Sequence, residues 1–155
     1  MFNQDVQIAF SLAVREAQRR RHEYLTTEHV LYAILFEEAG QDVVTACGGD
    51  FDRLRQGLEE FFERHVEALD AKEETVPEQT VGLQRMLQRT VAHMHSSGKQ
   101  EIGLGDVLAA IAEQAHSHAA QLLQAEGVTR LDILNFISHG IIKAPRAEAT
   151  PQPGS

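Results

Sequence analysis

Apolar residues recur every three or four positions along almost the whole chain, which is the spacing of one face of an α-helix. The first stripe contains Val6, Phe10, Ala13, Val14 and Ala17. Further stripes fall within residues 30–35, 43–47, 51–66, 83–94, 107–111, 122–123 and 131–137. No segment shows the sustained alternation of a half-buried strand flanked by hairpin turns. The pattern predicts an all-α protein.

Residues with strong preferences for helix ends separate these stripes. Thr26, Asp50 and Thr129 each precede a stripe and are good N-caps, because their side-chain oxygens can accept a hydrogen bond from the first helical turn. Glycine favours the left-handed conformation that often ends a helix. The glycines that we expect at helix ends are Gly40, Gly48, Gly98, Gly127 and Gly140.

Two segments interrupt the helical pattern. Residues 67–80 are acidic and polar and contain Pro77, so we expect an exposed connector with no packing of its own. Residues 143–155 are rich in proline and small side chains, which predicts a flexible tail or linker. The ordered part of the chain is therefore expected to span residues 1–142.

The two halves of the chain resemble each other at an offset of 77 positions, without a gap. The offset aligns Val14 with Val91, and Arg53 with Arg130. It also aligns 30–31 with 107–108 and 33–34 with 110–111. We therefore predict two four-helix repeats, about 1–66 and about 81–142, which pack into one domain because each is too small to close its own core.

The composition is that of a globular protein without covalent cross-links. The chain has 155 residues, of which 43% are hydrophobic, and one cysteine, Cys47, which cannot form a disulfide within the chain. Cys47 lies in an apolar stripe, as a buried small side chain would. The start of the chain does not read as a signal peptide, and no apolar run approaches the roughly 20 residues that span a bilayer. These features favour the cytoplasm and exclude a membrane-embedded protein.

The net charge of −9 argues against a nucleic-acid partner, because an acidic surface repels phosphate groups. The first 80 residues hold 17 acidic against 8 basic side chains, whereas residues 81–155 hold 6 of each. The one basic cluster, residues 19–21, is short, and cations there complement the end of a helix.

Catalytic and metal-binding patterns are weak. The chain has no phosphate-binding G-x-x-x-x-G-K-[ST] loop, and no nucleophile with a positioned base can be assembled from the sequence, so we predict a non-catalytic chain with no cofactor of its own. The eight histidines keep open an alternative, a metal-dependent or autonomous helical regulatory domain with histidine ligands. Their spacings match no common zinc site, and no metal site is expected.

Three segments carry a resemblance to a known family. HEYLTTEHVLYAIL, residues 22–35, resembles the H-x-x-x-T-x-E-H-L-L signature of Clp amino-terminal domains. Residues 83–111 are similar to the matching part of the second Clp repeat, and RLDILNFISHG, residues 130–140, is similar to the closing helix of the ClpA branch. The resemblance covers residues 1–142 and implies a pseudo-two-fold bundle of eight helices made of two four-helix Clp repeats.

The resemblance also implies which modules and partner proteins accompany this domain. In the family, this domain precedes two AAA+ modules that form a hexameric ring and feed substrates to the ClpP peptidase. ATP and magnesium are therefore expected only in those modules, which this chain lacks. In the ClpA branch the domain docks the adaptor ClpS, which delivers proteins with destabilising amino-terminal residues. The family also allows weak direct contact with unfolded substrates, or a role as a mobile lid over the ring.

Five positions match the residue types that the resemblance assigns to adaptor docking: Glu23, Glu28, Thr80, Arg85 and Arg130. We expect exposed carboxylates to meet lysines of the partner, and arginines to hold its carboxylates. Each residue has a simpler alternative. Glu28 could complement the dipole of its own helix, and Arg130 has a repeat mate, Arg53, which favours a structural role.

Overall fold

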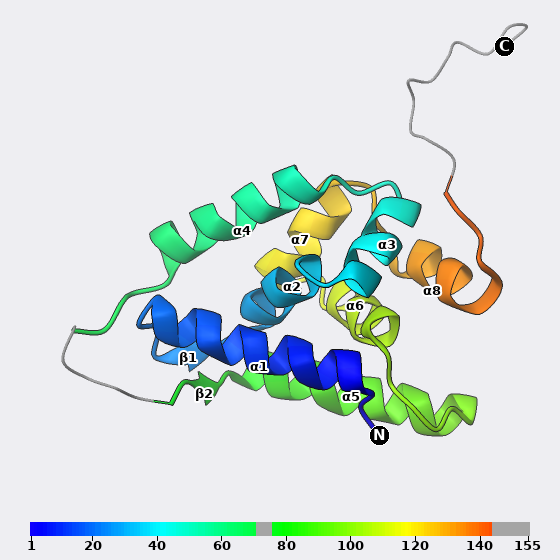
Figure 1. The fold of residues 1–155 in the computed structure, drawn as a ribbon, viewed down its shortest axis with the longest axis horizontal. Coiled ribbons are helices and arrows are strands. Elements are labelled where there is room, and N and C mark those ends of the chain that lie inside the picture. The colour runs from blue at the N-terminus through cyan, green and yellow to red at the C-terminus, as the bar shows by residue number, and fades with distance from the viewer. Residues whose placement is uncertain (71–75, 144–155) are drawn as a thin grey trace, which may run out of the picture.

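The computed structural model describes residues 1–70 and 76–143 (Figure 1). Within these ranges the chain forms eight helices and two strands of two residues each. In chain order they are α1 Gln4–Arg19, β1 Tyr24–Leu25, α2 Thr27–Leu35, α3 Glu38–Ala46, α4 Phe51–His65, β2 Glu78–Gln79, α5 Val81–Ser97, α6 Leu104–Glu113, α7 His118–Ala125 and α8 Arg130–His139. The predicted all-α fold is confirmed.

The first two helices of each repeat follow the predicted offset, because α5 and α6 begin 77 residues after α1 and α2. The expected absence of a gap is wrong, because α7 and α8 begin 80 and 79 residues after α3 and α4, so Arg53 and Arg130 do not occupy the same place in their helices. The packing is also repeated, because α1 lies on α2 as α5 lies on α6, while α3 packs against α8 and α4 against α7. Helices of one half thus pack against helices of the other half at the centre of the bundle. The predicted eight-helix architecture is confirmed.

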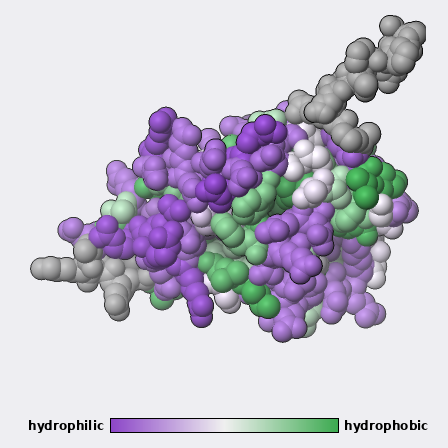
Figure 2. All heavy atoms as spheres, turned by 45° about the horizontal axis from the view of Figure 1, so that its top comes forward, coloured by the Kyte–Doolittle hydropathy of each residue, from purple (hydrophilic) through white to green (hydrophobic). Residues whose placement is uncertain are grey.

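Helices α2 and α6 form the centre of the core. All nine residues of α2 are buried, and seven of the ten residues of α6 are buried. A helix that is covered on every side belongs in a core, whereas the outer helices bury one stripe each. The face in Figure 2 is mainly hydrophilic, with smaller apolar patches between the polar side chains. None of the helices in the described ranges is long and apolar enough to cross a membrane.

The predicted N-caps are confirmed. Thr26 Oγ1 accepts from the backbone N–H of His29 at 3.3 Å, and Asp50 Oδ1 accepts from that of Arg53 at 2.9 Å. Thr129 starts α8 in the same way. Four of the predicted terminal glycines have positive φ angles and follow the last turn of a helix: Gly48, Gly98, Gly127 and Gly140.

The prediction for Gly40 is wrong. Helix α2 already ends at Leu35, and Gly40 lies inside α3 with a helical backbone. A Cβ atom at this position would lie 2.1 Å from the backbone oxygen of Ile34 and 2.6 Å from its Cγ2. Gly40 is therefore required because α3 folds back tightly against the end of α2, and not because of a left-handed turn.

The connector is more tightly held than its composition predicts. Strand β2 pairs in parallel with β1, Tyr24 opposite Glu78 and Leu25 opposite Gln79. Pro77 is buried, and the backbone N–H of Leu69 donates to Arg21 O at 2.7 Å. Both described ends of residues 67–80 are thus bonded to the segment between α1 and α2, and residues 71–75 lie outside the described ranges.

Lys143, which we assigned to the tail, is packed against the bundle. Its backbone N–H donates to Ala46 O at 2.8 Å, and its Nζ contacts Gly127 O at 2.5 Å and Asp132 Oδ2 at 2.8 Å. The remainder of the predicted tail, residues 144–155, lies outside the described ranges.

Candidate functional site

A groove of about 840 Å³ lies where the starts of α2, α5 and α7 meet the end of α4. We call it the central groove. Its polar and aromatic lining residues include Thr27, Glu28, Phe61, His65, Thr80, Arg85, Arg89, Glu113, Gln114 and His118. Three of the five predicted docking residues, Glu28, Thr80 and Arg85, therefore line one groove. The structure brings together residues that are more than 50 positions apart in the sequence.

Gln114 connects two of the helices that line this groove. The hydroxyl of Thr27 donates to Gln114 Oε1 at 3.2 Å, and Gln114 Nε2 donates to the backbone oxygen of Gly82 at 2.8 Å. The side chain thus connects the start of α2 to the start of α5. The sequence offered no signal for this role, because it depends on the packing of one repeat against the other.

Thr80 follows β2 and lines the groove, while Glu23 directly precedes β1, the strand that pairs with β2. Thr80 caps α5 through a 3.1 Å bond from the backbone N–H of Leu83, and its own N–H donates to Leu25 O at 3.0 Å. The backbone oxygen of Glu23 accepts from the N–H of Glu78 at 3.0 Å, while its side chain is exposed. The side chain of Glu23 is therefore free to meet a partner, but it does not line the groove.

The exposure expected for Glu28 is wrong. Glu28 is only 6% exposed, and its Oε2 accepts a buried hydrogen bond of 2.9 Å from the backbone N–H of Ala119, in the first turn of α7. A carboxylate there satisfies one of the unpaired N–H groups at the helix start and complements its dipole. Glu28 therefore holds α7 against α2, in addition to any part in docking.

We expect Glu28→Ala to lower the free energy of unfolding by about 1–3 kcal/mol, because it leaves the buried Ala119 N–H without an acceptor. Glu28→Gln keeps a side-chain oxygen and should lose less. Urea unfolding of both variants measures the difference. Equal losses in the two variants would show that this hydrogen bond does not hold α7.

Arg85 and Arg130 occupy different places. Arg85 is exposed on α5 and lines the central groove. Arg130 lies outside the groove lining but is linked to it by Glu113, because Arg130 Nε lies 3.7 Å from Glu113 Oε2. Glu113 also forms an ion pair with Arg89 at 3.4 Å, and its Oε2 lies 3.2 Å from His93 Nε2. One carboxylate thus faces three nitrogen-bearing side chains.

The groove also contains an aromatic wall that sequence reasoning missed. The rings of Phe61 and His118 stack with centroids 4.6 Å apart, and His65 lies 5.6 Å from Phe61 and 6.0 Å from His118. Phe61 follows the apolar stripe of α4, which identifies it as a core candidate. Its contact with His118 depends on α4 packing against α7, which no local pattern reveals.

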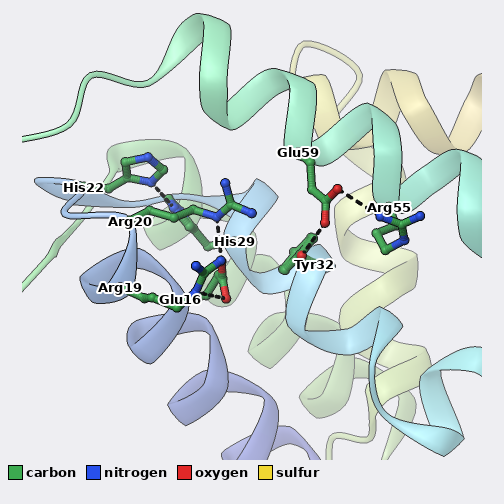
Figure 3. A network of polar contacts seen from close by, with 8 residues as sticks. All are labelled: Glu16, Arg19, Arg20, His22, His29, Tyr32, Arg55 and Glu59. Atoms are coloured by element: carbon green, nitrogen blue, oxygen red, sulfur yellow. Dashed lines mark hydrogen bonds and ion pairs between the residues drawn. The ribbon is translucent and has the colours of Figure 1, made fainter.

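The histidines of the signature form a buried pair between α1, α2 and α4 (Figure 3). His22 Nδ1 lies 2.8 Å from His29 Nε2, and His29 Nδ1 accepts from the backbone N–H of Thr26 at 3.0 Å. His29 must therefore carry its proton on Nε2 and donate it to His22, so both rings are neutral. His29 thus closes a capping box with Thr26 at the start of α2.

The surroundings of this pair disfavour a positive charge. His29 stacks on Phe62 with ring centroids 4.6 Å apart, and both histidines are almost fully buried. Burial, together with His22 and Arg20, lowers the pKa of His29 to about 3. Burial and Arg20 also lower the pKa of His22. The pair is a neutral part of the core at physiological pH.

Polar pairs extend this cluster outward (Figure 3). Arg20 Nε donates to Glu16 at 2.6 Å while its guanidinium lies 4.9 Å from the Phe62 ring. Further along α4, the hydroxyl of Tyr32 donates to Glu59 at 2.7 Å. We call these residues, with His22 and His29, the repeat-one network.

The described residues offer little reactive chemistry. Burial raises the pKa of the Cys47 thiol to about 11, so it stays protonated at neutral pH. Across residues 1–70 and 76–143, no three His, Cys, Asp or Glu side chains lie close enough to hold a metal ion. The arrangement of charged and aromatic groups around the central groove is suited to binding.

Comparison with known proteins identifies the family of this chain. The Clp repeat (R) N-terminal domain family matches residues 1–126. A ClpA homolog protein of Fuscovulum blasticum is 36% identical over 158 residues, which cover 99% of this chain and 20% of that protein. The chain thus spans about a fifth of the length of this relative.

Solved structures share the fold at low sequence identity. The Hsp104 N-terminal domain of Candida albicans matches with a TM-score of 0.75 and 10% identity, over 96% of this chain and 99% of that one. The N-domain of ClpV from Vibrio cholerae matches with a TM-score of 0.72 and 20% identity, over 88% and 82%. A complex of a ClpV N-domain with a VipB peptide has a TM-score of 0.69 and 18% identity, over 89% and 85%. This chain belongs to the family of Clp repeat amino-terminal domains, which are non-catalytic.

Proposed function

We propose that this chain is the adaptor- and substrate-docking domain of a ClpA-type ATP-dependent unfoldase, and that it binds a ClpS-type adaptor beside the central groove. The observation that carries the proposal is that Thr80 and Arg85 line this groove, while Glu23 is bonded through its backbone to Glu78, in the segment that leads into it. Peptide binding by a ClpV N-domain, as in its complex with a VipB peptide, supports docking as a use of this fold.

The charges at the groove edge suit a partner with both signs of charge. Glu23 is exposed directly before β1, and Arg85 is exposed one helical turn into α5. A basic side chain of the adaptor would meet Glu23, and an acidic one would meet Arg85. Such complementary pairs select the partner and fix its orientation, even where they add little net affinity.

The similarity to a ClpA homolog supports the proposal that this domain is part of a larger unfoldase. In this proposal the adaptor brings substrates with destabilising amino-terminal residues to a cytoplasmic hexamer, whose AAA+ modules use ATP and magnesium and pass the unfolded chains to ClpP. The domain also contacts unfolded substrates directly.

Isothermal titration calorimetry with a purified ClpS-type adaptor tests the assignment. We expect a one-to-one complex that Glu23→Lys and Arg85→Glu each weaken by about 2–5 kcal/mol if the pairs are desolvated, and less if they lie at the rim. These two variants are preferable to substitutions of Glu28, because Glu28 also stabilises α7.

The matched control is Glu101→Lys. Glu101 is exposed in the loop between α5 and α6, at the opposite end of α5 from the groove (Figure 1). It changes the net charge as Glu23→Lys does but should leave the affinity unchanged. Unchanged binding in both groove variants, or an equal loss in the control, would overturn the assigned surface.

A further inference from the structure

The chain reverses direction after α8. Gly140 has a left-handed backbone, with φ of 68°, and ends the helix. The backbone N–H of Ile141 then donates to Asn135 O at 3.4 Å. Two residues later, the side chain of Lys143 reaches Asp132, in the first turn of α8. Residues 141–143 therefore run back along the helix that precedes them.

Lys143 bonds this returning segment to both repeats. Its backbone N–H donates to Ala46 O at 2.8 Å, and this carbonyl at the end of α3 has no donor within its own helix. Its Nζ donates to Gly127 O at 2.5 Å and to Asp132 Oδ2 at 2.8 Å. Gly127 follows α7 and Asp132 belongs to α8. One residue thus connects α3 of the first repeat to the turn between α7 and α8 of the second.

Apolar burial contributes little to the attachment of this segment. The side chains of Ile141 and Ile142 are exposed, the latter by 70%. The side chain of Lys143 is half-buried, and its Cδ lies close to Gly48, at 3.9 Å from the position of an added Cβ. The polar bonds of Lys143 are therefore the main contacts that hold residues 141–143 against the bundle.

Asp132 is held in place to receive the ammonium group of Lys143. Its Oδ2 also accepts from the backbone N–H of Thr129 at 3.3 Å, in the capping box of α8. Burial alone would raise the pKa of Asp132, but the hydrogen bonds from Lys143 and Thr129 lower it. The carboxylate is therefore ionised at neutral pH and attracts the lysine as a fixed negative charge.

The contacts of Lys143 lie at the opposite end of the α4–α7 pair from the central groove. The end of α4 and the start of α7 line that groove. Ala46 lies just before the start of α4, and Gly127 lies just after the end of α7. The 15 residues of α4 span about 22 Å, at a rise of about 1.5 Å per residue. Figure 1 accordingly shows the described chain ending beside α3 and α8, away from β1 and β2.

We propose that Lys143 is a latch, which fixes the point where the predicted linker leaves the domain at the end opposite the central groove. The proposal rests on the proposed function in one respect, that the chain continues into further modules. With the latch closed, the groove faces an adaptor on the side away from the linker. With the latch open, the linker begins after Gly140 and gains three residues, or about 10 Å of reach when extended. The latch thereby sets both the length of the linker and the direction from which the groove is approached.

Nuclear magnetic resonance of the isotope-labelled chain tests the latch through Lys143→Met, which keeps the length of the side chain and removes its charged donor. Backbone order parameters of residues 141–143 should be about 0.85 in the wild type and below about 0.6 in the variant. The amide hydrogen at position 143 should exchange at least tenfold faster in the variant, because its bond to Ala46 O opens. The pKa of Asp132, followed by its carboxyl carbon shift, should rise toward its ordinary value.

Lys99→Met is the matched control. Lys99 also forms a 2.8 Å ion pair with an aspartate in the first turn of a helix, Asp106, which also accepts from the backbone N–H of Gly103. This variant should keep the wild-type order of residues 141–143 and the wild-type pKa of Asp132. Circular dichroism checks that both lysine variants remain folded.

A second variant approaches the latch from its other side. Asp132→Asn removes the negative charge but keeps an oxygen for the N–H of Thr129, so it should loosen residues 141–143 without ending α8. If Lys143→Met leaves this segment ordered and its amide exchange unchanged, or if Lys99→Met loosens it equally, Lys143 is not a latch. No adaptor takes part in these measurements, so a failure of adaptor binding and a failure of the latch are observed separately.

Discussion

Replacing Gly40 with alanine will destabilise the domain by about 1–3 kcal/mol or more, the cost of forcing extra atoms into a packed core. The added methyl group would lie 2.1 Å from the backbone oxygen of Ile34. A backbone atom cannot move aside as a flexible side chain can, so α3 must shift away from α2. Chemical unfolding monitored by circular dichroism measures the loss.

Gly82 provides the matched control. It also lies in the first turn of a helix, α5, but is exposed, and its nearest neighbour would be Thr80 Oγ1 at 3.9 Å from an added Cβ. Gly82→Ala should therefore stabilise the chain by about 0.4–1 kcal/mol, because alanine restricts the unfolded state. The same sign of change in both variants would contradict the tight α2–α3 packing.

Acidification from pH 7 to pH 4 will remove on the order of 3 kcal/mol of stability through His29. The folded state keeps this ring neutral with a pKa of about 3, while its ordinary value is 6.5. The unfolded chain therefore binds a proton that the folded chain does not. The contribution is fully present above pH 6.5 and is lost progressively as the pH falls toward 3. His22, whose pKa is also lowered, acts in the same direction.

The slope of stability against pH isolates this effect from that of the carboxyl groups. His29→Phe cannot take up a proton, so its loss of stability between pH 7 and pH 4 should be smaller than that of the wild type, although its stability at pH 7 is lower. His95→Gln, at an exposed position of α5, should keep the slope of the wild type. Urea unfolding at several pH values gives the slopes, and equal slopes for His29→Phe and the wild type would contradict the neutral pair.

Local chemistry explains what could be predicted from the sequence. Thr26 and Asp50 were identified as caps because a cap depends only on the three residues that follow it. Gly40 was misread for the same reason: its role depends on Ile34 in a different helix, and glycine alone does not distinguish a left-handed turn from a close contact.

The family signature shows a similar limit in the site. Glu28 matches a position that the resemblance assigns to docking, and its type gives no warning that the carboxylate is buried against Ala119, 91 positions further along the chain. His22 and His29 lie on either side of the Thr26 cap, so no helical periodicity places them on one face. The turn at that cap instead brings the two rings together. Contacts between distant segments decide both cases.

The central position of α2 and α6 has a consequence for how the domain loses its structure. Each repeat supplies a central helix that the other must cover, and Glu28 adds a hydrogen bond from the first repeat to α7 of the second. Separating the halves would expose both central helices to water at once. The two repeats therefore unfold together in one cooperative transition, and neither repeat has a folding free energy of its own.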